Sequence, residues 1–76
     1  MTEHEKAKAW RESMSLTIAR LSDLTGYSVE SIYEMERGKK AGTHEMIKPW
    51  IKHRYKLICA GVHQQLTSGK TFEWGK

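Results

Sequence analysis

Apolar residues recur every three or four positions along several stretches of this chain, the spacing that gathers them on one face of an α-helix. Ala7, Trp10 and Met14 form the first such stripe. Thr2 precedes the stripe with Glu5 three positions later, which is the spacing of a helix capping box. The pattern therefore predicts a helix near the N-terminus, broken by the serines on either side of Met14.

Two short helices with a tight turn between them are predicted in the middle of the chain, at 18–25 and 29–37. Thr17 and Ser28 can cap them, because a hydroxyl oxygen can accept an otherwise unpaired N–H group of the first helical turn. Each helix is followed by a glycine that can take the left-handed conformation of a helix end, Gly26 and Gly38. Their inward faces are predicted to consist of Ile18, Leu21, Leu24, Val29, Ile32 and Met35.

A longer helix is predicted at about 48–67, with an inward face made of Ile51, Tyr55, Ile58, Val62 and Leu66. Pro49 suits its first turn, where a missing N–H group costs nothing. Trp50 and Tyr55 are expected in the core, in preference to serving as platforms on which bases stack. Gly61 lies in the helix interior, where glycine is roughly 1 kcal/mol less favourable than alanine. Its presence there indicates a close approach of another backbone.

The tail at 68–76 carries Phe72 and Trp74 two positions apart, as in an extended strand. Two large aromatic residues in so short a tail are expected to cover the core or a partner subunit. The chain contains no repeat and no low-complexity tract. Residues 1–76 are therefore predicted to form a single domain of the all-α class.

The composition limits the classes of protein to which the chain can belong. Its 76 residues suffice for one small core. The single cysteine excludes an intramolecular disulfide, which suits a reducing compartment. No apolar run approaches the ~20 residues of a membrane span, and the first ten residues, MTEHEKAKAW, lack the apolar region of a signal peptide. We expect a cytoplasmic protein that does not associate with a membrane.

The formal net charge of +4 is unevenly distributed. Residues 1–38 hold five Lys and Arg against seven Asp and Glu, a net charge of −2, whereas residues 39–76 hold eight against two, a net charge of +6. The excess begins in a predicted loop at 39–43 and continues along the long helix as a four-residue repeat of Lys48, Lys52 and Lys56. A basic half suits an anionic partner, although on spacing alone the repeat is better explained as the solvated face of a helix.

The stretch from Trp10 to Gly38, WRESMSLTIARLSDLTGYSVESIYEMERG, resembles the lambda repressor-like helix-turn-helix family of the Cro and Xre type, without a gap. The matching positions are Leu16, Leu21, Leu24, Gly26, Ser28, Ile32 and the closing Glu36-Arg37-Gly38. The resemblance implies a small bundle of four to five helices with the motif at about 17–38 and an extended C-terminal tail. It also implies a transcription regulator, such as a repressor, of the kind found in bacteria, phages and mobile elements.

In this family the helix at 18–25 would lie across the DNA backbone and the helix at 29–37 would enter the major groove. The positions that would face bases are Val29, Glu30, Tyr33 and Glu34. Those that would face phosphates are Thr17, Ser28, Ser31, Arg37, Lys39, Lys40, Lys48 and Lys52. The implied partner is double-stranded DNA, bound by a homodimer because one copy contacts only a few base pairs.

The chain departs from the family pattern in two places. Ile18 replaces a glutamine that commonly binds phosphate, and the base-facing helix is acidic. Glutamate can accept a hydrogen bond from cytosine N4, and valine can pack on a thymine methyl group, so Glu30, Glu34 and Val29 can still read bases while lysines supply affinity. The alternative is a helix-turn-helix fold with little DNA affinity that binds a larger transcriptional regulator as an antagonist or adaptor. Tyr33 would then belong to a protein interface.

Glu36 has a structural interpretation instead. In the family its counterpart is buried and pairs with an arginine of the first helix, and the matching residue here is Arg11. The resemblance therefore implies a structural Arg11–Glu36 ion pair rather than a DNA contact.

Metal binding and catalysis are not favoured by the sequence. Cys59 and His63 share one helical face, but a zinc site needs further ligands that neither His53 nor another residue supplies in a convincing pattern. Cys59 is better explained as a small buried residue. There is also no nucleophile-base constellation and no glycine-rich phosphate loop. We expect no metal, no cofactor and no enzymatic activity.

Overall fold

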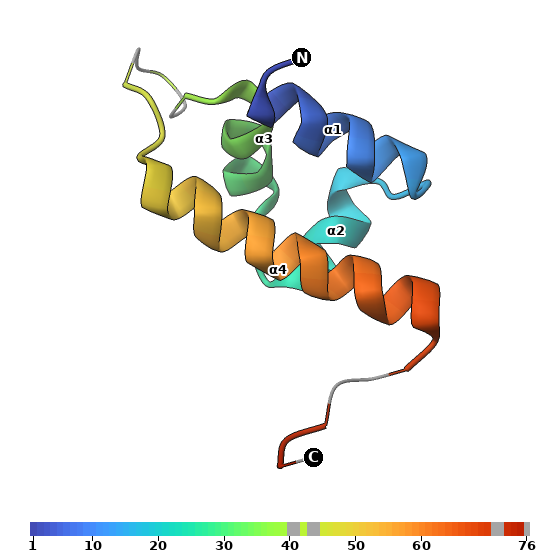
Figure 1. Cartoon of the computed structure of the whole chain (residues 1–76). Coiled ribbons are helices and arrows are strands. Elements are labelled where there is room, and N and C mark those ends of the chain that lie inside the picture. The colour runs from blue at the N-terminus through green and yellow to red at the C-terminus, as the bar shows by residue number, and fades with distance from the viewer. Residues whose placement is uncertain (40–41, 43–44, 71–72, 76) are drawn as a thin grey trace.

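The computed structural model describes residues 1–39, 42, 45–70 and 73–75. Within these residues it contains four helices and no strand, in the order α1 (Glu3–Ser13), α2 (Ile18–Thr25), α3 (Val29–Arg37) and α4 (Pro49–Ser68). The prediction of an all-α protein is confirmed. Figure 1 shows α4 running along the length of the molecule, with α2 and α3 lying between it and α1. Helix α3 contacts both α1 and α2, and α2 also contacts α4.

The first helix begins where the capping box predicts. The backbone N–H group of Glu5 donates to the Thr2 hydroxyl oxygen at 3.3 Å, and the Thr2 backbone N–H group donates to the Glu5 carboxylate at 3.3 Å. This exchange satisfies two N–H groups that the start of a helix leaves unpaired.

Helices α2 and α3 have the predicted bounds because their end signals are local. The Thr17 hydroxyl accepts from the N–H group of Arg20 at 3.0 Å, and the Ser28 hydroxyl accepts from that of Ser31 at 3.1 Å. Gly26 ends α2 with a φ of 81°, and Gly38 ends α3 with a φ of 78°, both in the left-handed region. A side chain is disfavoured in that conformation, which explains the glycines.

Helix α4 also begins and ends within one residue of the predicted bounds, with Pro49 in its first turn. The segment before it returns to the end of α3, since Lys39 and Met46 form an isolated antiparallel bridge and the Ile47 N–H group donates to the Gly38 carbonyl at 3.2 Å. Among the described residues, no helix is long and apolar enough to cross a membrane.

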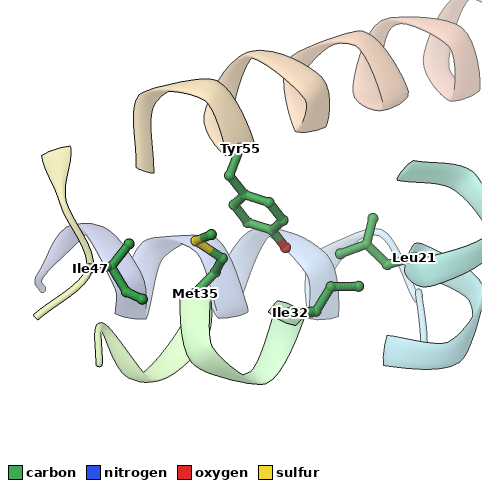
Figure 2. Close-up of a cluster of buried hydrophobic side chains, with 5 residues drawn as sticks. All are labelled: Leu21, Ile32, Met35, Ile47 and Tyr55. Carbon is green, nitrogen blue, oxygen red and sulfur yellow. The ribbon is translucent and has the colours of Figure 1, made fainter. Parts of the chain in front are cut away.

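The core is small and draws on every helix. Five buried side chains from α2, α3, α4 and the segment before α4 form its centre (Figure 2): Leu21, Ile32, Met35, Ile47 and Tyr55. Helix α1 contributes Ala7 and Trp10 from the side, both partly buried. The ring of Tyr27 meets that of Tyr55 edge to face, with 5.3 Å between their centroids.

Several predictions about inward-facing residues are wrong. Trp50 is 62% exposed, because helical spacing places it on a side of α4 away from the buried Tyr55. Val29 is exposed rather than inward-facing, and Leu66 is 41% exposed. Gly61 is also exposed, and no atom beyond its own helix lies within 4 Å of the position of an added Cβ, so no backbone of the described chain approaches it.

The predicted packing of the tail over the core is not found at Trp74, which is 91% exposed. Phe72 lies outside the described residues. Cover by a partner subunit, the other possibility that the sequence raises, stays a prediction.

Candidate nucleic-acid interface

Helix α3 presents one exposed face and buries the other. Val29 is 43% exposed, Tyr33 is 52% exposed, and Glu30 is also exposed. They lie within about one turn of one another and are all exposed, whereas Ile32 among them is buried. Three of the four residues expected to face bases are thus accessible on one surface. Glu34, the fourth, is half-buried at its edge.

The turn at 26–28 fixes the orientation of α3 against α2. The Ser22 hydroxyl donates to the Tyr27 carbonyl at 2.6 Å, and the Tyr27 N–H group donates to the Thr25 hydroxyl at 3.2 Å. Ile32 is fully buried and anchors α3 in the core. The exposed face of α3 is therefore carried on a rigid support.

The N-termini of α2 and α3 supply N–H groups of the kind that bind phosphate. A helix N-terminus leaves several backbone N–H groups without a partner in the helix, and its dipole favours an anion. Thr17 and Ser28 are exposed, and their hydroxyls accept one N–H group each while the Ser28 hydroxyl donates to that of Ser31 at 3.0 Å. These three residues, expected to face phosphates, thus hold the two helix starts in shape.

Two cations directly follow the exposed face of α3. Arg37 and Lys39 are both exposed, on either side of the buried Gly38. A Cβ added to Gly38 would lie 2.7 Å from Nδ1 of His4, so α1 approaches the end of α3 closely here. Lys40, expected to extend this cationic segment, lies outside the described residues.

An open groove of about 660 Å³ lies between α1 and the end of α3. Its cations are Lys8, Arg37 and Lys39, and its carboxylates are Glu5, Glu12 and Glu36. Lys8 is exposed and was not predicted as a site residue, because α1 was treated only as a support. Lys8 lies near Arg37 and Lys39 only because α1 packs beside the end of α3. The sequence offers no local pattern that predicts this contact.

The three lysines that recur every four residues along α4 differ in their exposure and in their contacts. Lys48 is exposed at the start of the helix, and Lys52 is half-buried one turn later. The amine of Lys56 lies 3.7 Å from the Glu3 carboxylate of α1, with both side chains largely exposed. An exposed pair of this kind contributes little to stability. Lys48 and Lys52 are the two cations of α4 that the sequence predicts to face phosphates, and that role stays a prediction.

The ion pair expected between Arg11 and Glu36 is present. Nε of Arg11 donates to Oε2 of Glu36 at 2.7 Å and Nη2 donates to Oε1 at 3.0 Å, while Nη1 donates to the Leu16 carbonyl at 2.9 Å. The hydrogen bonds to Glu36 raise the pKa of Arg11 above its ordinary value. Only 11% and 6% of the two side chains are exposed, so this fork joins the last turn of α3 to α1.

Two of the residues considered for a metal site, His63 and Cys59, have other contacts. Nε1 of Trp10 donates to Nδ1 of His63 at 3.1 Å, which joins α1 to α4. Burial raises the pKa of the half-buried Cys59 thiol, which lies against Tyr55. No group of three His, Cys, Asp or Glu side chains among the described residues is arranged to hold a metal ion.

No protein-family model matches this chain, and no curated protein and no solved structure is significantly similar to it. The case for a function therefore rests on the geometry and chemistry of its own residues.

Proposed function

We propose that this protein is a small sequence-specific DNA-binding transcriptional regulator of the lambda repressor-like helix-turn-helix type. In this proposal α3 is the recognition helix and lies in the major groove, and α2 lies across the backbone. The protein acts as a homodimer on a two-fold operator.

One observation carries the proposal. Helix α3 is capped by Ser28 and anchored by Ile32, and it offers an accessible face followed directly by the exposed cations Arg37 and Lys39. A rigid helix with an open face supports base reading, and cations at its end support binding to phosphates on either side of the groove. The exposed N-termini of α2 and α3 add N–H groups that can bind phosphate.

The acidic residues of α3 lead to a specific proposal about which bases this helix contacts. Glu30 is exposed and can accept a hydrogen bond from cytosine N4, and the exposed Val29 can contact a thymine methyl group. Carboxylates are repelled by phosphates, so α3 itself contributes discrimination, while the surrounding lysines and Arg37 contribute affinity.

The test is an NMR titration of isotopically labelled protein with the DNA upstream of its own gene and with scrambled DNA of the same composition. We expect residues of α3 and Lys39 to shift with the upstream DNA and the complex to persist at physiological salt. Equal, weak binding of both DNAs that disappears as salt rises would contradict sequence-specific recognition, because that behaviour is typical of non-specific phosphate contacts.

A second candidate function is the binding of a larger transcriptional regulator as an antagonist or adaptor. The exposed Tyr33 beside Glu30 favours it, since tyrosine is enriched at protein interfaces. Under this function Tyr33→Ala or Glu30→Lys abolishes capture of the partner, whereas Lys39→Glu has no effect on it. Under the DNA-binding function Lys39→Glu weakens the complex with DNA.

A further inference from the structure

Helix α4 has a second apolar face that the described chain leaves uncovered. Trp50 is 62% exposed and Leu57 is 60% exposed, and Gly61 follows four residues later. Helical spacing places these three residues, here called the outer seam, on one side of α4. Tyr55 marks the opposite side, where α4 packs on the core. Two large apolar side chains and a bare glycine thus share one side of α4 with the exposed Arg54, which lies between Trp50 and Leu57.

Gly61 borders an apolar recess. Together with Leu24, Ile58, Val62, Leu66 and one polar residue, Gln65, it lines a groove of about 240 Å³ between the end of α2 and the second half of α4. Because no atom beyond its own helix lies within 4 Å of an added Cβ, a side chain from elsewhere can lie directly over Gly61. Glycine is unfavourable inside a helix, and neither a positive φ nor a neighbour in the described chain requires it here.

The charges of α4 distinguish between the ways in which a second helix could lie on the outer seam. The first half of α4 and its cap carry Lys48, Lys52, Arg54 and Lys56, whereas residues 57–68 contain no Lys, Arg, Asp or Glu. Two copies packed in parallel would bring the basic halves together. Two antiparallel copies place each basic half against the uncharged half of the other.

We propose that the outer seam is a homodimer interface on which α4 of a second copy packs antiparallel. Trp50 of each copy lies over Gly61 of the other and enters the apolar recess beside it. The arrangement is self-complementary, as a two-fold axis requires, because each copy supplies one bulky side chain and one bare site. The axis crosses the two helices at the level midway between Trp50 and Gly61, so Arg54 and Leu57, on the outer-seam side of α4, lie close to it.

This inference deepens the proposed function, since a regulator on a two-fold operator needs a surface for its second copy. It also leaves the candidate DNA surface free, because Lys52 lies on a different side of α4 from Trp50 and Leu57. The measurements below contain no DNA, so failure of the interface and failure of DNA binding can be told apart.

Sedimentation equilibrium of the full chain tests the interface. We expect the natural sequence to dimerise, and Trp50→Ser and Leu57→Ser each to raise the dissociation constant by about tenfold or more, as loss of a central apolar anchor does. Gly61→Leu should dissociate the dimer too, because the new side chain fills the recess from its own subunit. The control is Met46→Ser, which removes another exposed apolar side chain, 53% exposed, outside α4 and should leave the dimer intact. Circular dichroism checks that each variant stays helical.

Disulfide cross-linking tests the orientation. Trp50→Cys and Gly61→Cys are made separately in a Cys59→Ser background, and one of the two proteins carries an isotopic label. Mixing and oxidising them should give the mixed disulfide, because the antiparallel arrangement brings position 50 of one copy to position 61 of the other. Homodimeric disulfides at each position would instead indicate parallel packing and overturn the proposal. So would a natural sequence that stays monomeric up to near-millimolar concentration, or a dimer that the seam variants do not weaken.

Discussion

The guanidinium of Arg11 makes three hydrogen bonds, two to Glu36 and one to the Leu16 carbonyl. Arg11→Ala would leave a carboxylate that is only 6% exposed without its counter-ion. Breaking one side of a buried pair costs about 3–5 kcal/mol, a large part of the ~5–15 kcal/mol that a small domain has in total. We expect Arg11→Ala to lose cooperative thermal unfolding in circular dichroism. Glu12→Ala, at the exposed neighbouring residue, should unfold as the natural sequence does.

Two glycines give opposite predictions for the same substitution. Gly61 is helical with open space at its Cβ, so Gly61→Ala should stabilise the monomer by roughly 1 kcal/mol through helix propensity. Gly26 has a φ of 81°, so Gly26→Ala should destabilise it by roughly 1–2 kcal/mol, because a side chain is strained there even though no atom is in the way. Urea unfolding at concentrations that keep the chain monomeric measures both. A stabilising Gly26→Ala would contradict the left-handed end of α2.

Cys59 gives a pH-dependent prediction. Burial raises the pKa of its thiol, so at a given pH less of the reactive thiolate is present than for an exposed cysteine. We expect iodoacetamide to modify Cys59 more slowly than a cysteine at the exposed position 46, made as Met46→Cys with Cys59→Ser. The gap should narrow as pH rises toward the pKa of the thiol. Equal rates at neutral pH would show that the thiol is not held in the interior.

At the scale of helices, the sequence predicted where each helix begins and ends better than it predicted which side of a helix packs against the core. The caps Thr17 and Ser28 and the glycines 26 and 38 gave the bounds of α2 and α3, because each cap depends on atoms a few residues away. The prediction that Trp50 lies in the core is wrong, because the outer seam of α4 also has apolar residues at helical spacing. Periodicity identifies an apolar face, but it cannot say which of two faces meets the core.

In the candidate site, too, features that depend on local spacing could be predicted from the sequence, whereas contacts between helices could not. The accessibility of Val29, Glu30 and Tyr33 follows from the period of α3, once Ile32 is placed in the core. The Arg11–Glu36 contact spans 25 residues and came from the family resemblance, since no spacing rule joins two helices. Lys8 was missed for the same reason, because its nearness to the end of α3 depends on tertiary structure.

The junction between α1 and the end of α3 yields a prediction about elements rather than single residues. Gly38→Ala adds a methyl group 2.7 Å from Nδ1 of His4 at a φ of 78°. Gly26→Ala meets the same backbone strain without a neighbour, so it serves as the matched control. We expect Gly38→Ala to cost more stability than Gly26→Ala in urea unfolding. Adding His4→Ala should remove the difference, because the clash is with the end of a flexible side chain. A cost that His4→Ala leaves unchanged would place the conflict in the backbone.

At the scale of the whole molecule, the acidic and basic halves of the sequence correspond to different parts of the structure. The acidic half of the chain includes the exposed face of α3, and the basic half begins at Lys39, directly after α3 ends. The outer seam lies on α4, on a side different from that of Lys52. In the proposed regulator these surfaces have separate tasks: α3 discriminates among bases, the cations around it bind phosphates, and the seam joins two copies.

The salt dependence of DNA binding tests this division of tasks. Each phosphate contact that a cation makes adds ~0.9 to the slope of log affinity against log salt. We expect Lys39→Gln to weaken binding of the upstream DNA and to reduce that slope by ~1 per copy, while the preference for upstream over scrambled DNA persists. Lys70→Gln is the matched control, since it removes the same charge at an exposed position beyond α4. Glu30→Gln should have the complementary effect, with the slope retained and the preference between DNAs altered. If Lys39→Gln and Lys70→Gln lower the slope equally, the attraction comes from overall charge, and the cations after α3 have no particular place on the DNA.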